Sequence, residues 1–455
     1  MSIVSMKIKN LKSIKEAEII FKNNLSGIYG PNGTGKTAVI EALEIIRNYF
    51  ISYYKKEISE KVKEKILQCM RKGENNLSIE VIFYISGILY KLAVEFNKSK
   101  EGNSLYVSKE ELSSVPLESK TLYAKPKKVY RSIARIENDE KTILPKIYLY
   151  EKEFDEMIEK EILLKNDLSK KELFLEYNNF CSYLSLVLKY SRYEKTEIVS
   201  EKLKDFIEIF QKIEDTLMKV VVITLKEQAL YNLDILIPLN VHTENIHGVL
   251  MVNYKKGGNI YSEKEASELE KVVNQIGNIF SIIVPHSKLK IHKKIENIGK
   301  DENKIGINIF VEKDGKEIPL EMESTGIVKL VSILSVMVYF VQDSEAIVAI
   351  DELDIHIFEY LLAVLLEKLS LYAKGQLIFT AHNLLPMEKL SKNSIIVSTK
   401  DENESVIYTY MENTSATTNL RQKYIKSQVM WSEKNISPLL LNNSAMDLYI
   451  KKLVI

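Results

Sequence analysis

One octapeptide, residues 30–37, constrains the fold of this chain more than any other feature. It reads Gly-Pro-Asn-Gly-Thr-Gly-Lys-Thr, the G-x-x-x-x-G-K-T pattern of a phosphate-binding loop (P-loop). A short apolar run, residues 25–29, precedes it, and an apolar run at helical spacing, residues 38–46, follows it. This order predicts a buried strand, a glycine-rich turn and a helix N-terminus. The alternative is a chance glycine turn before a helix, and both flanks disfavour it.

Each residue type in this loop has a physical role toward a polyphosphate. Glycine lets the backbone curl without Cβ clashes, and the helix N-terminus offers N–H groups and the positive end of a dipole. The side chain of Lys36 can reach β- and γ-phosphates, and the Thr37 hydroxyl can ligate Mg²⁺. We therefore predict a nucleotide site with Mg²⁺. The contacting residues are Gly30, Pro31, Asn32, Gly33, Thr34, Gly35, Lys36 and Thr37.

Composition and charge limit the class of protein. Apolar residues make up 45% and charged residues 27% of the chain, which is typical of globular proteins. The net charge is 63 − 62 = +1, so no global field attracts nucleic acid, although a local basic patch remains open. Cys69 and Cys181 have no partner spacing, which excludes a thiolate zinc cluster and indicates a reducing compartment.

No apolar run approaches the roughly 20 residues that span a membrane. Lys7, Lys9 and Lys12 interrupt the apolar residues at the N-terminus, where a cleavable signal would need an unbroken run. We therefore expect a soluble, cytoplasmic protein that does not contact membranes.

The hydrophobic pattern divides the chain into four regions. The first and third alternate strands and helices, and the last holds a short helix and a polar tail. The second is irregular over residues 98–126 and largely helical from residue 151, with a capping box at Ser262 and Glu265. Composition alone leaves open whether this second region is an insertion or an independent domain. The four regions are 1–97, 98–305, 306–410 and 411–455.

Two apolar strands in the third region end in polar residues. Asp351 and Glu352 follow one of them, and His382 follows the next. Ligands on open α/β sheets bind beyond the carboxyl ends of strands, so we expect these residues to converge on the P-loop. Asp351 is suited to hold Mg²⁺, Glu352 to act as a general base and His382 to contact a γ-phosphate. The alternatives are a solvated helix start for the acidic pair and a surface histidine.

Ser324 precedes an apolar run of helix length, residues 327–341. A serine in this place caps the helix, and its hydroxyl and the following N–H groups form a second anion site. An ordinary N-cap without a ligand is the alternative.

Together these motifs resemble an ABC-type ATPase head of the SMC and OLD-nuclease kind. More narrowly, the chain is similar to the stand-alone AAA-family ATPases of bacterial defence systems, of the RloA and PARIS type. The resemblance covers about a third of the chain. It implies an α/β fold with a mixed β-sheet core, a P-loop lobe, a largely helical insertion and a second lobe. The segments that carry it are 9–14, 30–37, 323–326, 350–356 and 379–382.

The resemblance also implies roles for single residues. Asp351 resembles the Walker-B aspartate that binds Mg²⁺, and Glu352 resembles the catalytic glutamate. Asp354 resembles the nucleotide-contacting D-loop aspartate, and His382 resembles the switch histidine. Ser324 stands where the family has its signature serine, which contacts the γ-phosphate of ATP bound to a second subunit. The implied catalytic residues are Lys36, Glu352 and His382, and the implied cofactors are ATP and Mg²⁺.

The chain departs from the family pattern at three points. Residues 324–326 do not complete the L-S-G-G-Q of transporters, and no glutamine is placed as the Q-loop residue. Ile357 and Phe358 replace the usual proline after the D-loop histidine. These departures favour slow turnover and leave nucleotide binding unaffected.

Two functions remain open at this point. The first is an ATP-hydrolysing sensor and scaffold in anti-phage defence, which forms homo-oligomers through its ATPase heads. It would control a separately encoded effector, a TOPRIM-type nuclease, in response to a nucleic-acid or phage-protein trigger. The second is a DNA-repair or DNA-processing ATPase of the SMC or OLD kind.

Features outside the ATPase motifs favour the first function. OLD nucleases carry a TOPRIM domain after the ATPase, whereas the 73 residues after His382 (455 − 382) hold no glutamate and D-x-D pair in a βαβ pattern. A repair head needs a long coiled coil, and the middle region shows no sustained heptad. The absence of an N-K-x-D motif disfavours a GTPase, and a transporter subunit would not explain the large middle region.

Overall fold

The structure is a computed structural model of the full chain. The residues that it describes are 2–51, 56–99, 105–116, 131–137, 146–148, 201–224, 236–242, 247–253, 260–297, 303–411, 418–429, 436 and 446.

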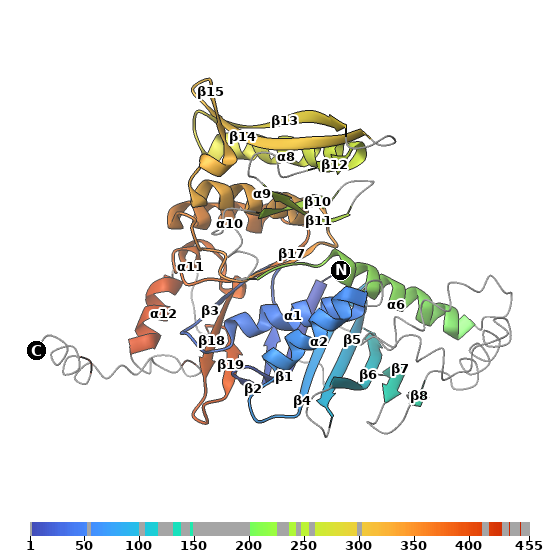
Figure 1. Cartoon of the computed structure of the whole chain (residues 1–455). Helices are drawn as coiled ribbons and strands as arrows, with labels where there is room; N and C mark the ends of the chain where they lie inside the picture. The colour runs from blue at the N-terminus through green and yellow to red at the C-terminus, as the bar shows by residue number, and fades with distance from the viewer. Residues whose placement is uncertain are drawn as a thin grey trace, which may run out of the picture.

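A six-stranded sheet lies at the centre of the fold, in the order β19-β18-β3-β17-β16-β9 (Figure 1). Every neighbouring pair is parallel except β18 and β19. Its inner strands are short apolar runs that are buried on both faces, as strands covered from both sides must be. The strands are β3 (Leu25–Tyr29), β9 (Val221–Ile223), β16 (Ile347–Ile350), β17 (Gln376–Thr380), β18 (Ile395–Lys400) and β19 (Val406–Thr409).

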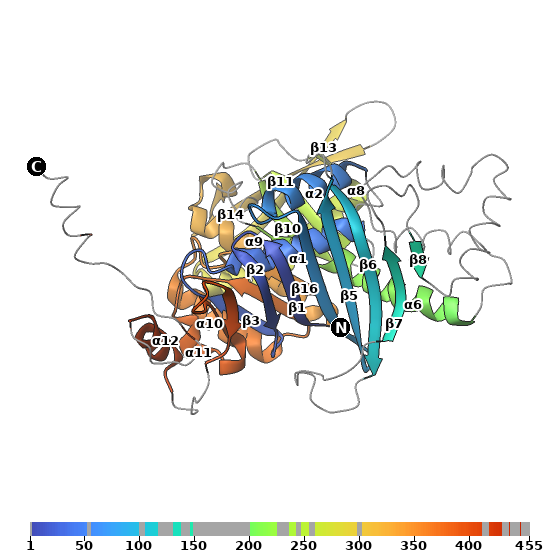
Figure 2. The ribbon, with the colours of Figure 1, turned by 90° about the horizontal axis from the view of Figure 1, so that it is seen from below.

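A second sheet is wholly antiparallel, in the order β2-β1-β4-β5-β6-β7-β8, and Figure 2 shows its strands side by side. The predicted hairpin at Gly87 is confirmed as β4 and β5, whereas β6 corrects the expectation that residues 98–126 are irregular. The strands are β1 (Ser2–Leu11), β2 (Ile14–Ile20), β4 (Asn76–Ile85), β5 (Ile88–Lys98), β6 (Leu105–Pro116), β7 (Arg131–Glu137) and β8 (Lys146–Tyr148).

Helix α1 (Lys36–Ile51) lies between the two sheets. Its apolar residues share one core with β1, β4 and β5 on one side and with one face of the central sheet on the other. Two further helices, α2 (Lys56–Cys69) and α6 (Glu201–Lys219), border this core, which confirms the predicted helix around Phe210. The P-loop at the start of α1 therefore opens at one end of the central sheet.

The other face of the central sheet is covered by helices α9 (Thr325–Gln342) and α10 (Glu359–Tyr372), and α8 (Glu263–Ile283) packs on the far side of α9. The predicted capping box opens α8, where the side chain of Ser262 accepts from the backbone N–H of Glu265. By length and composition α9 could cross a membrane, with a mean hydropathy of 1.7 over 18 residues. Because 67% of that stretch is buried inside the fold, the apolar character of α9 is that of a core helix.

A third, antiparallel sheet packs on α8. Its strands are β12 (Ile260–Ser262), β13 (Ser287–Asn297), β14 (Asn303–Lys313) and β15 (Lys316–Pro319). The remaining elements are the hairpin β10 (Leu236–His242) and β11 (His247–Asn253), helices α11 (Pro386–Lys389) and α12 (Leu420–Val429), and the 3₁₀ turns η2 (Leu320–Met322) and η3 (Lys392–Ser394).

The structure confirms the predicted α/β class and the predicted mixed-sheet core. It corrects the expectation of a largely helical second region. Over its described residues this region mixes strands with α6 and α8, adds β6 to the P-loop lobe and adds β9 to the central sheet. The apolar stripe predicted between residues 154 and 162 lies outside the described residues. At β9, pairing with β16 overrode the local helical pattern.

Gln376 ties the first strand of the chain to the central sheet. Its amide accepts from the backbone N–H of Ile3 at 2.8 Å and donates to the carbonyl of Ile3 at 2.9 Å, and its side chain is buried. Gln376→Leu leaves both backbone groups without partners. We expect it to lower the free energy of unfolding by about 2–4 kcal/mol, measured by urea denaturation. Gln422→Leu, on the exposed face of α12, is the control and should change it by less than about 0.5 kcal/mol. An equal loss of the free energy of unfolding in the two variants would contradict the prediction.

Candidate nucleotide-binding site

The P-loop has a backbone shape that requires glycine. Gly33 and Gly35 have φ angles of 80° and 87°, a region that other residues rarely adopt. A Cβ on Gly30 would lie 2.2 Å from the carbonyl oxygen of Ser398, so no other residue could occupy this place. The Thr34 hydroxyl donates to the carbonyl of Pro31 at 2.8 Å and closes the turn. The loop is thus held as a compact cradle for an anion.

The predicted phosphate-binding lysine is buried inside this loop. The ammonium of Lys36 donates to the carbonyl oxygens of Gly30 at 2.8 Å and Pro31 at 3.1 Å. Burial lowers the pKa of Lys36, while the nearby carboxylates of Glu352 and Asp351 act to raise it. These carbonyls are weaker partners than a phosphate, so the ammonium can exchange them for a charged ligand.

Thr37 and Asp351 form a two-oxygen site for a cation. The Thr37 hydroxyl lies 3.2 Å from Oδ1 of Asp351 and donates to it. Adjacent corners of a Mg²⁺ octahedron, with bonds of 2.0–2.1 Å, are about 3 Å apart, so these oxygens fit such an ion. Mg²⁺ in nucleotide sites commonly takes one or two carboxylates and completes its shell with phosphate oxygens and water. The predicted metal ligands are therefore together, on α1 and at the end of β16.

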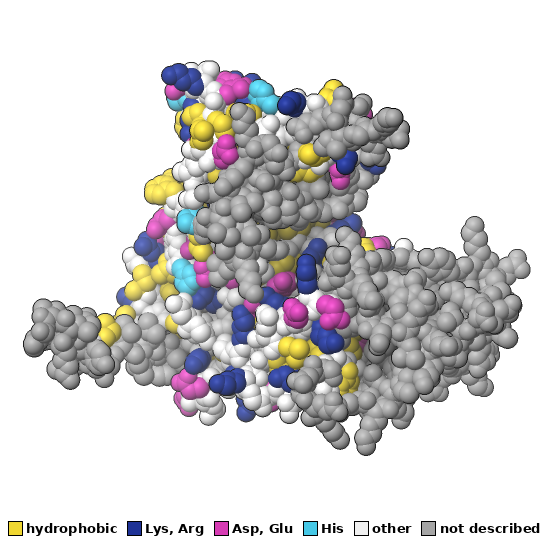
Figure 3. All heavy atoms as spheres, in the orientation of Figure 1, with side chains coloured by type: hydrophobic (Ala, Val, Ile, Leu, Met, Phe, Trp, Pro, Cys, Tyr) yellow, Lys and Arg dark blue, Asp and Glu magenta, His cyan; other side chains and the backbone are white. Residues whose placement is uncertain are grey.

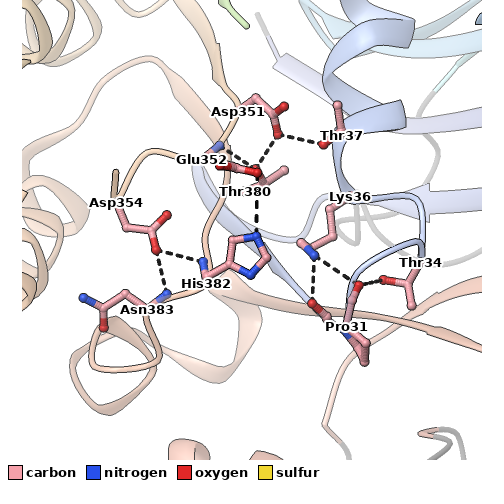
Figure 4. A network of polar contacts seen from close by, with 11 residues as sticks. Pro31, Thr34, Lys36, Thr37, Asp351, Glu352, Asp354, Thr380, His382 and Asn383 are labelled. Atoms are coloured by element: carbon pink, nitrogen blue, oxygen red, sulfur yellow. Dashed lines mark hydrogen bonds and ion pairs between the residues drawn. The ribbon is translucent and has the colours of Figure 1, made fainter. Parts of the chain in front are cut away.

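Thr380, at the end of β17, joins the two acidic residues. Its hydroxyl donates to Oδ1 of Asp351 at 2.6 Å and accepts from the backbone N–H of Glu352 at 2.7 Å (Figure 4). Glu352 has a φ of 46°, an uncommon conformation for a non-glycine residue, and the bond from its N–H holds this turn. Strained backbone of this kind is concentrated at functional sites.

His382 faces the predicted general base. Its Nε2 lies 3.7 Å from Oε1 of Glu352, and both side chains remain partly exposed to solvent. In Figure 4 the imidazole points toward Glu352 from the neighbouring strand end, and Lys36 lies beside it on the P-loop side. The structure therefore brings together Lys36, Thr37, Asp351, Glu352 and His382, as the sequence predicts.

Asp354 occupies a supporting position in this structure. Its Oδ2 accepts from the backbone N–H groups of His382 at 2.9 Å and Asn383 at 2.7 Å. The carboxylate thus fixes the turn that carries the histidine. The predicted contact between Asp354 and a nucleotide stays a prediction.

Ser324 stands apart from this cluster. It is exposed and caps α9, where its hydroxyl accepts from the N–H of Ile327 at 3.4 Å. The start of α9 lies against the turn after Asp354, because a Cβ on Gly326 would be 3.0 Å from the carbonyl oxygen of His356. Within the described contacts, nothing links Ser324 to the P-loop of the same chain.

Sequence reasoning missed two residues of the site. Thr380 connects Asp351 to Glu352, and its only sequence signal is its place two residues before His382. Lys329 is buried in α9 within electrostatic range of Glu352, and burial lowers its pKa to about 8. A single lysine within an otherwise apolar helix is a signal that could have identified it.

Asp351 gives the site a testable pH dependence. Burial raises its pKa, although the hydroxyls of Thr380 and Thr37 oppose this. Because the folded-state pKa is raised, the nucleotide-free protein loses stability as the pH rises through that pKa. Asp351→Asn keeps an oxygen for both hydroxyls and removes the charge. We therefore expect a higher melting temperature than wild type at neutral pH, with a difference that shrinks as the pH is lowered.

The control for this measurement is Asp314→Asn, in the exposed turn between β14 and β15. It removes a carboxylate that water solvates, so its melting temperature should follow that of wild type at every pH. A melting temperature of Asp351→Asn below wild type at neutral pH would contradict the argument from burial.

Comparison with known proteins gives matches to ATPases, in agreement with the nucleotide site described above. The sequence profile of the AAA ATPase domain matches residues 1–384. The DNA double-strand break repair Rad50 ATPase of Nanoarchaeum equitans is 23% identical over 198 residues, which are 43% of this chain and 23% of that protein. The Rad50 ATPase of Methanopyrus kandleri is 35% identical over 94 residues, which are 20% of this chain and 9% of that protein.

The chain thus spans less than a quarter of the length of these relatives. Among solved structures, an SMC head bound to the C-winged helix domain of ScpA matches with a TM-score of 0.42 and 14% identity, over 94% of this chain and 100% of that one. The matched profile contains the P-loop, the Asp351-Glu352 pair and His382, which are the groups that the fold gathers at one edge of the central sheet. The chain therefore belongs to the family of AAA ATPase domains.

Proposed function

We propose that this protein is a cytoplasmic, Mg²⁺-dependent ATPase with slow turnover that acts as a sensor and scaffold in anti-phage defence. It binds ATP between α1 and the carboxyl ends of β16 and β17. It assembles through its ATPase heads and controls a separately encoded effector, which we propose is a TOPRIM-type nuclease. ATP hydrolysis is the activity of the family. The assembly, the effector and the trigger are the parts of the proposal that experiments must test.

The observation that carries the proposal is the arrangement of Glu352 and His382 opposite the P-loop. Lys36 and the loop N–H groups bind and orient the phosphates, and Thr37 and Asp351 would hold Mg²⁺. The ion, when bound, neutralises charge on the β- and γ-phosphate oxygens. Glu352 would take the proton of the attacking water, and His382, 3.7 Å away, would orient that carboxylate and contact the γ-phosphate.

The surface beside Ser324 supports assembly of two heads. Met322, Phe358 and Tyr360 form what we call the signature patch, with exposed fractions of 72%, 73% and 59%. The segments that carry them meet where Gly326 approaches His356. Hydrophobic side chains lie at the left margin of the face shown in Figure 3, beside the ends of α9 and α10. Exposed aromatic residues and methionine are typical of protein interfaces, so a second copy is the proposed occupant.

If Ser324 completes the site of a second subunit, two inactive variants should restore each other. Ser324→Arg keeps a working P-loop and blocks the surface at the signature patch. Lys36→Ala disables the P-loop and leaves the signature patch intact. Each alone should hydrolyse little ATP. An equal mixture should recover up to about a quarter of the wild-type rate, because half of the dimers are mixed and each holds one intact site. Steady-state ATPase rates against mixing ratio give the measurement.

The control mixes Ser324→Arg with the double variant Ser324→Arg, Lys36→Ala. Here no pairing yields an intact site, so the rate should stay at background even though mixed assemblies form. Recovery in the control would show that the site does not need Ser324. No recovery in the test mixture, when native mass spectrometry shows mixed assemblies, would place the complete site within one chain.

The effector proposal rests on the resemblance and on the chemistry of the site. The cluster of site residues described above suits a nucleotide. ATP that binds one of two conformations of a scaffold more tightly shifts the scaffold toward that conformation. The second region of the chain contributes β12, β13 and α8, which the nucleotide motifs do not need. These elements form a surface on which a partner could bind and from which it could be released.

We predict that the purified protein cleaves neither DNA nor RNA in Mg²⁺ or Mn²⁺, and that its expression alone is harmless. Co-expression with the neighbouring gene should stop growth after phage infection. Lys36→Ala should abolish this response, since nucleotide binding is lost. Glu352→Gln should still bind ATP but lose roughly 10²–10⁴-fold in hydrolysis, which separates binding from turnover. Nuclease activity that co-purifies with the single chain and survives Lys36→Ala would contradict the scaffold proposal.

The similarity to Rad50 favours a second candidate, a DNA-repair or DNA-processing ATPase. Under this alternative, ATP should strengthen binding of the protein to DNA, and deletion of the gene should sensitise cells to DNA breaks without a phage. An ATP-independent affinity for DNA, together with normal resistance to breaks, would exclude it.

A further inference from the structure

The C-terminal hairpin of strands β18 and β19 lies directly against the P-loop. β18 pairs in parallel with β3, the strand that leads into the loop, and Val397 is opposite Tyr29. Across the hairpin, Ser398 on β18 is opposite Tyr408 on β19. These two side chains are neighbours on one face, and both reach the backbone of the loop.

Each of them donates a hydrogen bond to a loop carbonyl. The hydroxyl of Ser398 donates to the carbonyl oxygen of Thr34, and the hydroxyl of Tyr408 donates to the carbonyl oxygen of Gly35 at 2.7 Å. Thr34 and Gly35 are consecutive, so the hairpin binds two successive peptide groups of the P-loop. Ser398 is fully buried, and burial raises the pKa of Tyr408, which keeps its phenol protonated as a donor.

The geometry of the peptide bond makes these contacts informative. In a planar trans peptide the C=O and the following N–H point in opposite directions. The carbonyls of Thr34 and Gly35 belong to the same peptide groups as the N–H groups of Gly35 and Lys36. When the carbonyls point toward the hairpin, these two N–H groups point away from it, into the cradle. Successive N–H groups of this kind form an anion-binding nest.

The hairpin also restricts the space behind the loop. A Cβ on Gly35 would lie 2.9 Å from the Tyr408 hydroxyl and 3.1 Å from a side-chain carbon of Val406. Gly35 is in the left-handed region, where a peptide can flip easily because no side chain opposes it. Hydrogen bonds from the hairpin are therefore what select one orientation of these peptides.

We propose that Ser398 and Tyr408 are positioning residues that hold the N–H groups of Gly35 and Lys36 toward the phosphates. Neither touches the nucleotide. Both act by raising the fraction of molecules whose loop is ready to bind, and the apparent dissociation constant scales inversely with that fraction. The inference rests on the proposed nucleotide site and adds to it a determinant of phosphate affinity from strands that lie beyond the matched ATPase profile.

The test is Tyr408→Phe, which removes one hydroxyl and keeps the ring. We expect the dissociation constants of ATP and ADP to rise roughly three- to tenfold, the range for loss of one hydrogen bond, measured by calorimetry. KM should rise by the same factor while kcat changes little, since Glu352 and His382 are untouched. Binding of adenosine, which has no phosphate, should be unchanged. A merely structural role would not separate ATP from adenosine.

Tyr410→Phe is the matched control. The Tyr410 hydroxyl donates to the carbonyl of Ile20 at 2.6 Å and accepts from the N–H of Lys22 at 3.1 Å, away from the loop. Its loss should cost stability without changing nucleotide affinity. Ser398→Ala is the second test variant and should weaken ATP and ADP as Tyr408→Phe does.

The outcomes are distinct. Wild-type protein that binds no ATP would reject the nucleotide site itself. If wild type binds, then unchanged ATP affinity in both Tyr408→Phe and Ser398→Ala would overturn the positioning role. Equal weakening in Tyr410→Phe would also overturn it, because the effect would then come from general loosening of the hairpin. Weakened ATP and ADP binding in the test variants alone supports it.

Discussion

Burial of α1 on every side is the constraint on which the rest of the site depends. Its apolar residues face the antiparallel sheet in one direction and the central sheet in the other, so the helix cannot rotate or slide. Each buried side chain such as Val39, Ile40 or Leu43 contributes about 1.5–3 kcal/mol. Several of them together outweigh the cost of burying Lys36 at the first position. The direction of the helix, and with it the N–H groups of its first turn, is therefore set by the core.

The acidic side of the site is held by polar contacts that oppose desolvation. Burial disfavours the charged form of Asp351, and the hydroxyls of Thr37 and Thr380 recover only part of that cost. The positive φ of Glu352 is a further unfavourable feature. Both are understandable if the bound cation and phosphates supply the missing favourable energy. The nucleotide-free site is thus less stable than its surroundings, which is the property expected of a binding site.

The sequence predicted the parts of the site that lie on single strands and loops. The P-loop, the Asp351-Glu352 pair and His382 were each identifiable from an apolar run followed by polar residues. Thr380, Ser398 and Tyr408 were not, because a hydroxyl in a strand is usually a surface or packing residue. The partners of Thr380 are 28 and 29 positions away, and those of Ser398 and Tyr408 are hundreds of positions away.

The second region was the least predictable part of the fold. Its strands take their stability from pairing with distant partners, as β9 does with β16, and local periodicity does not record this. Helix α8 was predictable because its capping box is a local signal. The difference between β9 and α8 is thus one of range: a cap is completed within four residues, whereas a parallel strand needs a partner from another part of the chain.

The order of the chain brings two distant segments together at the P-loop. Ser398 and Thr34 are 364 residues apart in sequence, and Tyr408 and Gly35 are 373 apart. Among the described strands, β3 pairs only with β17 and β18, so the strand that leads into the P-loop acquires its neighbours when this later part of the chain folds. Contacts of such long range form late, since loop closure must precede them. A chain that lacks these strands therefore retains the P-loop sequence but has lost the contacts that shape it, so the site is a property of the whole domain.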